Sequence, residues 1–278
     1  FMKSKFIFFT IFFNFLILSF ISAQNYSLSL NGSESSSASR GYISFPPPGS
    51  GSFSDNNFSV SFWVKGGDNS QSNYGSIFSM GTGVSNRRFS ILITGNLHVV
   101  GQNNDWNTTY SLPANKWTQI TVTYANGTTT LYVNGTSTAS TTSYTFNTDI
   151  FATTGMVLGK DVAGDDNEYF DGKIDEVRLW NATRTQAQIF SKKDTVLNGD
   201  ESGLIAYYNF QENSGSVAND TQTQSNNDGS IKNSPSWVSG PDLSKMSNSS
   251  YSNETVNLSS FYNNQLLVNN NLSISGSI

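Results

Sequence analysis

The strongest constraint on the fold is a series of short alternating strands joined by tight turns. Two Asn-Gly turns, Asn126-Gly127 and Asn134-Gly135, frame the alternating segments Trp117–Tyr124 and Thr129–Val133. Asn-Gly favours a two-residue hairpin turn because both central positions of that turn require positive φ. This part of the chain therefore predicts a β-meander, in which consecutive strands pair antiparallel.

The same alternation recurs at short intervals along most of the chain. Further strands are expected at Tyr26–Leu30, Gly41–Phe45, Phe58–Lys65, Ser76–Met80, Phe89–Thr94, Leu97–Val100, Met156–Leu158 and Leu204–Phe210. Only residues 181–190 favour a helix, with Thr183 as its expected cap. Aromatic residues make up 13% of the chain, which is ample material for a core. The pattern predicts an all-β sandwich or barrel.

One segment, Asp171–Trp180, is predicted to be a strand with apolar residues on both faces, so both faces should be covered. Asp175 lies in phase with Val177 and is expected to point toward the core. A buried carboxylate needs a cation, a metal or several N–H donors. We interpret Asp175 as a structural lock that binds backbone donors or an arginine, such as Arg178 or Arg184.

The N-terminus has the layout of a signal peptide. Two lysines precede an almost wholly apolar run, Phe6–Ile21, and the small residue Ala23 follows it. The run is short for a membrane span. We therefore expect cleavage and a secreted or cell-surface protein with no stable membrane span; an uncleaved anchor is the alternative.

Composition divides the rest of the chain, because from Ser244 onward it shifts to Ser and Asn, as is typical of a linker. The predicted parts are a signal peptide at 1–23, a β-sandwich at 24–241, a Ser/Asn-rich linker at 242–260 and the start of another domain at 261–278. Phe1 precedes Met2, and the last patterned stretch stops abruptly. We expect the chain to be a piece of a longer protein.

Charge and cysteine content exclude some classes of protein. The net charge is -5, and the sequence shows no basic cluster to neutralise phosphates, so no nucleic-acid partner is expected. Cysteine is absent, so stability must come from the core and from any bound ions rather than from disulfides.

Several segments, in this order and spacing, resemble the laminin-G-like, concanavalin A-like jelly-roll domains, including the pentraxin branch. They are Phe58–Lys65, Lys116–Tyr124 with Leu131–Gly135, Val157–Lys160 with Phe170–Trp180, and Gly203–Phe210 with Asn227–Gly229 and Trp237. The resemblance covers about residues 25–240 and implies a two-sheet antiparallel jelly-roll β-sandwich. Lectins, glycan-binding modules, glycosidases and adhesion domains all use this fold, so the resemblance leaves the function open.

The C-terminal stretch, residues 263–278, resembles something different. It is similar to the start of the C-terminal sorting domain used by type IX secretion in Bacteroidetes. This resemblance implies export to the cell surface or the medium.

An acidic loop before Asp171 is the candidate metal site. Calcium prefers several carboxylate, amide and carbonyl oxygens on a flexible loop. The pentraxin resemblance implies a calcium ligand at Asp161 and, in a second position, at Asn86. The candidate ligands together are Asp161, Asp165, Asp166, Asp171 and Asn86. A solvated acidic loop without a metal is the alternative.

The candidate carbohydrate site is centred on Trp106. Sugar sites combine an aromatic ring with amide and carboxylate partners, and Asn104, Asp105 and Tyr110 lie close to Trp106 in the sequence. Trp63 faces away from the apolar side of its strand and is expected on an open sheet face. The alternative is that both indoles pack against the core.

No catalytic motif accompanies these candidates. A glycosidase needs two carboxylates about 5 to 10 Å apart, and the sequence has no Glu-x-Asp-x-Glu strand motif. His98 lies in a predicted strand, and no Gly-x-Ser-x-Gly elbow accompanies it. We expect a binding module for an extracellular glycan or surface protein, not an enzyme, with Ca²⁺ as candidate cofactor. The alternatives are an accessory domain of a larger secreted enzyme and an adhesion domain without a small ligand.

Overall fold

A computed structural model describes residues 25–243, except for 35, 49–56, 68–74, 148–150, 152, 164–167 and 225. The expected signal peptide, nearly all of the linker and the stretch 261–278 lie outside the described residues. The chain divides into two units, 1–241 and 242–278, and the helices and strands described below belong to the first.

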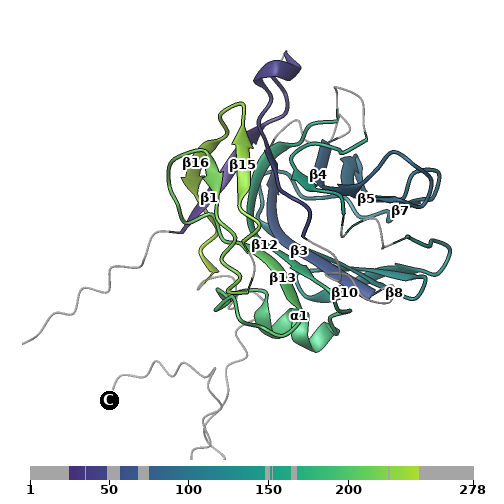
Figure 1. Cartoon of the computed structure of the whole chain (residues 1–278). Coiled ribbons are helices and arrows are strands. Elements are labelled where there is room, and N and C mark those ends of the chain that lie inside the picture. The colour runs from purple at the N-terminus through teal and green to yellow at the C-terminus, as the bar shows by residue number, and fades with distance from the viewer. Residues whose placement is uncertain are drawn as a thin grey trace, which may run out of the picture. The chain divides into compact units, whose positions relative to one another are not determined.

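Two eight-stranded antiparallel sheets, A and B, lie face to face as a jelly-roll sandwich (Figure 1), which confirms the expected fold class. Sheet A has the order β10 (Thr136–Thr141), β9 (Thr128–Val133), β8 (Thr118–Ala125), β3 (Asn57–Gly66), β12 (Asp171–Trp180), β1 (Tyr26–Asn31), β16 (Ser236–Ser239), with β13 (Leu204–Tyr208) also paired to β12. Sheet B has the order β14 (Val217–Ala218), β15 (Gly229–Lys232), β2 (Tyr42–Ser44), β11 (Met156–Leu158), β4 (Gly75–Gly81), β5 (Arg88–Thr94), β6 (Asn96–Val100), β7 (Asp105–Asn107). The described helices are the short 3₁₀ turn η1 (Ser37–Ser39) and α1 (Gln186–Lys192).

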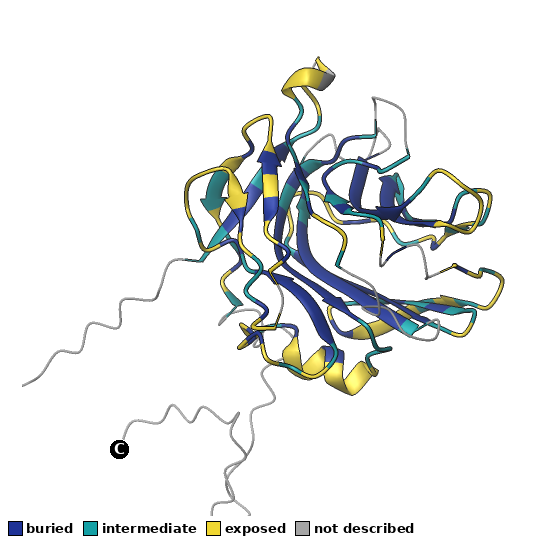
Figure 2. Cartoon of the chain, in the orientation of Figure 1, coloured by how far each residue is buried: buried dark blue, intermediate teal, exposed yellow. Residues whose placement is uncertain are grey.

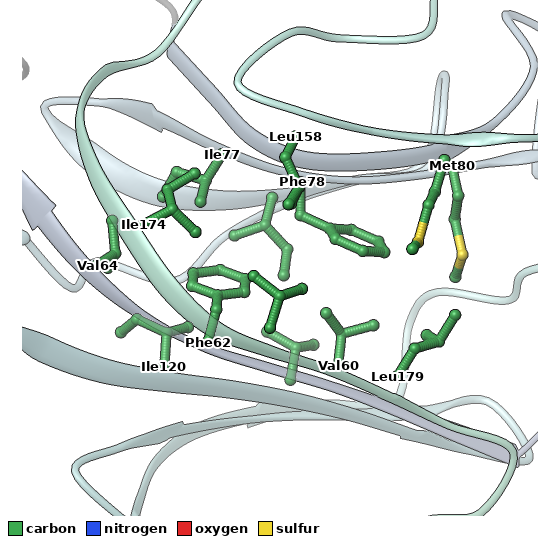
Figure 3. Packing of buried hydrophobic residues seen from close by; sticks show 14 of the residues in the cluster. Val60, Phe62, Val64, Ile77, Phe78, Met80, Ile120, Leu158, Ile174 and Leu179 are labelled. Carbon is green, nitrogen blue, oxygen red and sulfur yellow. The ribbon is translucent and has the colours of Figure 1, made fainter. Parts of the chain in front are cut away.

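The core lies between the inner faces of the two sheets. Phe62 and Ile174 of sheet A face Phe78 and Leu158 of sheet B in this layer (Figure 3), and all four are fully buried. Figure 2 shows the same division along the chain, with buried central strands and an exposed outer surface on α1. The alternation of the sequence thus places one side of each strand in a single apolar layer.

The Asn-Gly turns form as expected. Asn126 and Gly127 have φ values of 45° and 92°, and Asn134 and Gly135 have values of 50° and 81°. These positive φ angles are those that a two-residue hairpin turn requires. They fix the register of β8, β9 and β10, which pair in sequence order.

A bulge in β12 changes the direction of Asp175. Opposite β3, Asp175 pairs with Trp63 and Arg178 pairs with Ser61, so two residues of β12 face the one residue between them. Glu176, at the bulge, has a φ of 52°. The extra residue shifts the alternation by one. The prediction that Asp175 shares the face of Val177 was therefore wrong: Val177 lies in the core, and Asp175 lies on the outer face with Trp63.

The helix begins later than expected. It spans Gln186–Lys192, and its N-cap is Thr185 rather than Thr183; the Thr185 side chain accepts a hydrogen bond from the Gln188 backbone N–H. Thr183 instead donates its hydroxyl to the Tyr124 carbonyl oxygen at 2.8 Å. The segment that contains α1 covers part of the outer face of sheet A, around Trp63 and Arg178 (Figure 1). Within the part of the chain that the structure describes, no helix is long and apolar enough to cross a membrane.

Replacing Phe62 by alanine should test the core. Phe62 is fully buried, so Phe62→Ala is expected to lower the free energy of unfolding by about 3–5 kcal/mol in a chemical-denaturation experiment. Ser137→Ala, on the exposed edge strand β10, is the control and should change it by less than about 0.5 kcal/mol. A loss below about 1 kcal/mol for Phe62→Ala would contradict this packing.

Candidate functional site

A hollow on the outer face of sheet B is the candidate ligand site. Its volume is about 370 Å³, within the range of ligand pockets. Its lining includes Tyr42, Ser44, Met156, Val157, Lys160 and Asp161, and we call it the Tyr42 hollow. Tyr42 and Ser44 face outward because Ile43, between them, points into the core.

An aromatic pair with a cation lies beside the Tyr42 hollow. The rings of Tyr42 and Tyr169 meet edge to face with their centroids 6.2 Å apart. The Lys160 ammonium lies 5.5 Å from the Tyr42 centroid and 5.2 Å from the Tyr169 centroid. These distances are within the reach of cation–π attraction, which holds the lysine between the two rings. Tyr42 is half-buried and lines the hollow.

A buried ion pair fixes the loop beside this hollow. Arg88 on β5 and Asp161 on the loop after β11 form an ion pair at 2.5 Å, and both side chains are nearly inaccessible. Asp161 also accepts hydrogen bonds from the Ser79 hydroxyl and from the Ala163 backbone N–H. Arg88 makes a second ion pair with Glu168, at 3.2 Å. The loop is therefore tied to the outer face of sheet B by fully paired polar groups.

The described residues do not fit a calcium site. Asp161 is already bound to Arg88, and Asp171 opens β12, where its carbonyl oxygen accepts a hydrogen bond from the Gly67 N–H. Asn86 is exposed between β4 and β5. No group of three or more His, Cys, Asp or Glu side chains in the described ranges is placed to hold a metal. Asp165 and Asp166 lie outside those ranges, and calcium binding stays a prediction that depends on them.

The side chains of the predicted Trp106 site do not point toward one common position. Trp106 pairs with Val99, a core residue, and therefore faces inward; it is partly buried against the core. Asp105, its neighbour on β7, faces outward and is exposed. The Asn104 amide donates to the Thr145 carbonyl oxygen at 2.8 Å, and Tyr110 also packs against the core. A sugar site at Trp106 stays a prediction. In this structure the indole packs against the core at the edge strand β7.

Trp63 does not lie on an open sheet face. It is only 3% exposed, and its indole N–H donates to the Lys193 carbonyl oxygen at 2.8 Å. The expectation of an exposed ring was wrong because the segment around α1 covers this face of sheet A. Trp63 thus serves to attach that segment to the sheet.

A buried charged cluster lies under the same segment. The Arg178 guanidinium pairs with Glu176 at 2.5 Å and donates to the Lys192 carbonyl oxygen at 2.7 Å. The Tyr207 hydroxyl donates to Glu176 at 2.8 Å. Asp175 accepts hydrogen bonds from the Glu176 N–H and from the Asn25 amide. Asp175 thus binds a backbone donor, which was one of the two kinds of partner predicted from the sequence. Arg178, a candidate for the other kind, pairs with Glu176 instead.

Burial raises the pKa of Asp175 well above its usual range, and the adjacent Glu176 carboxylate raises it further. Burial also raises the pKa of Glu176, although Arg178 opposes that shift. The cluster is enclosed by the sheet and the segment around α1, so its role is structural.

Sequence reasoning missed Tyr42 and Lys160. The signal for Tyr42 was present, because in Gly41–Phe45 the residues Ile43 and Phe45 share the core side and leave Tyr42 on the other. No local pattern could have indicated that Lys160 reaches the Tyr42 ring. That contact depends on the pairing of β2 with β11, two strands far apart in the sequence.

A comparison with known protein families identifies the superfamily of this fold. A family model described as the concanavalin A-like lectin/glucanases superfamily (Laminin_G_3) matches residues 36–190, more than half of the chain. The chain belongs to this superfamily. Among curated proteins, none matches the chain.

Two solved structures with the superfamily's sandwich are similar to the chain. One is a candidate carbohydrate-binding protein from Bacteroides ovatus, with a TM-score of 0.58 and 23% identity over 78% of this chain and 60% of that one. The other is a heptameric SAP-like pentraxin from Limulus polyphemus, with a TM-score of 0.56 and 13% identity over 81% of this chain and 99% of that one. The chain thus spans about three fifths of the length of the Bacteroides protein. At these identities the likeness shows the fold.

The superfamily's description names both lectins and glucanases, so membership alone does not separate binding from hydrolysis. Hydrolysis needs two carboxylates across the scissile bond. Among the described residues that line the Tyr42 hollow, Asp161 is the one carboxylate, and Arg88 neutralises it.

Removing the charge of Asp161 should distinguish an ion pair from a metal site. In Asp161→Asn the new amide would face Arg88, so the free energy of unfolding should fall by about 3 kcal/mol, equally in Ca²⁺ and in EDTA. Thermal melts in both buffers measure this, with the exposed Asp105→Asn as control. A loss seen only with Ca²⁺ present would instead assign Asp161 to a metal.

The pKa of Asp175 predicts a dependence of stability on pH. The unfolded carboxyl has a pKa near the ordinary value of 3.8, whereas the pKa of the buried one is well above it. Between these two pH values the folded state keeps a proton that the unfolded state has lost, so stability falls as pH rises. Asp175→Asn keeps the hydrogen bond from the Glu176 N–H and removes this contribution.

Denaturation at about pH 4 and at about pH 7 should therefore show a smaller loss of stability in Asp175→Asn than in the native chain. Asp200→Asn, in an exposed position, should behave like the native chain. An equal pH dependence in all three proteins would show that Asp175 is not held neutral.

Proposed function

We propose that this chain is a carbohydrate-binding module that holds a sugar in the Tyr42 hollow. The observation that supports this most directly is an outward-facing, half-buried tyrosine beside a hollow of about 370 Å³ with polar groups around it. A sugar ring offers C–H groups to an aromatic face and hydroxyls to polar neighbours, so this combination suits it. Membership of a superfamily whose description includes lectins supports the same function.

The surroundings of the hollow favour recognition by a preformed surface. The Arg88–Asp161 pair ties down the loop beside it, and β2, β4 and β11 form its floor. A site that is fixed before the ligand arrives loses less conformational entropy on binding. We also propose that the module acts outside the cell, as the N-terminal sequence predicts, on its own or attached to a longer secreted protein.

Tyr42→Ala should weaken glycan binding while the fold remains intact. The ring is the aromatic surface of the hollow, and its loss should weaken binding at least about tenfold. A glycan array followed by calorimetry on the best ligand measures this. Tyr132→Ala, another half-buried tyrosine on the opposite outer face, is the matched control and should bind normally.

Two outcomes would change the conclusion. If Trp106→Ala loses binding and Tyr42→Ala does not, the site lies at the edge strand β7. If the native chain binds no glycan on the array, the proposed function is wrong.

A further inference from the structure

Cationic side chains gather around the tyrosine pair of the Tyr42 hollow. Lys160 lies between the rings of Tyr42 and Tyr169, and the Arg40 guanidinium lies 5.5 Å from the Tyr169 centroid. On β15, Lys232 is the cross-strand partner of Tyr42. Cross-strand partners point to the same face, so Lys232 extends beside Tyr42 on the outer surface.

The carboxylates in the described part of the loop around Lys160 are paired with another residue. Asp161 and Glu168 both form their ion pairs with Arg88, at 2.5 Å and 3.2 Å. Lys160 has no ion pair with any carboxylate in the described part of the chain, and its described contacts are the two rings. Cation–π contacts position the ammonium group without cancelling its charge. A half-buried cation in this state is ready to bind an anion from outside the protein.

We propose that the Tyr42 hollow is selective for anionic glycans, with a carboxylate or sulfate group of the sugar bound by Lys160 and the sugar ring against Tyr42. This proposal rests on the proposed function and names its ligand class. Uronic acids and sulfated sugars share the chemistry required, a negatively charged oxygen group on a sugar ring. Lys232, beside Tyr42, would meet the next charged residue of a polysaccharide chain.

The net charge of the chain argues against nonspecific attraction of polyanions. The chain has a net charge of -5, so its general electrostatic field repels polyanions. Affinity for an anionic polysaccharide must then come from a local cationic site. Weak attraction of a basic protein to any polyanion is not an explanation here.

The test compares the native chain with Lys160→Met, which keeps an unbranched apolar stem between the two rings and removes the charge. Affinity is measured for polygalacturonate, dextran sulfate and neutral dextran. We expect binding to one or both anionic polymers, weakened at least about tenfold in Lys160→Met because a charge-assisted hydrogen bond is lost. Lys192→Met is the matched control, because Lys192 is exposed on α1 over the other sheet, and it should bind as the native chain does.

Each outcome has a separate meaning. Binding to polygalacturonate alone identifies a carboxylate ligand, and binding to dextran sulfate alone identifies a sulfate ligand. Binding to neutral glycans only, or equal binding of the anionic polymer by Lys160→Met and the native chain, overturns this proposal and leaves the proposed function standing. If no glycan is bound at all, the proposed function has failed as well. Melting temperatures show whether Lys160→Met remains folded.

Discussion

The buried pair of Glu176 and Arg178 attaches the segment around α1 to sheet A. Arg178 pairs with Glu176 and also donates to the carbonyl oxygens of Lys192 and Thr195, so one guanidinium joins sheet A to the segment around α1. The indole of Trp63 adds a further bond to the same segment. Local hydrogen bonds offset the cost of burying a charged pair, and the segment accepts two of them from Arg178. The outer face of sheet A is thereby covered around Trp63 and Arg178, and the Tyr42 hollow lies on the other sheet.

The bulge in β12 is the origin of this arrangement. Without the extra residue at Glu176, strict alternation would place Asp175 on the core side with Val177. With it, Ile174, Val177 and Leu179 all point inward, and the charged residues and Trp180 lie on the outer side. A residue with positive φ in the middle of a ten-residue strand costs free energy. The contacts of Glu176 with Arg178 and Tyr207 offset that cost.

The sequence predicted the features that depend on local rules and failed where distant segments decide. Asn-Gly turns and alternation depend on neighbouring residues, so the meander and the two-layer sandwich could be predicted. The bulge depends on how β12 meets β3, and the burial of Trp63 depends on a segment about 130 residues away. For the site, Tyr42 could have been found from its outward position, but Lys160 and the Arg88–Asp161 pair exist only after β2, β5 and β11 are assembled.

The Arg88–Asp161 pair also limits what the one carboxylate of the hollow's described lining can do. A carboxylate acts as a metal ligand or as a general acid only if its oxygens are available. Those of Asp161 are held by Arg88, Ser79 and the Ala163 N–H, and the same arginine binds Glu168. The Arg88 guanidinium thus pairs with both Asp161 and Glu168 and holds the loop against β5. Of the two charged residues in the described lining of the hollow, Lys160 is the one that our proposal assigns to a ligand. The acidic loop that the sequence marked for metal binding would then serve, in its described part, to support a cation.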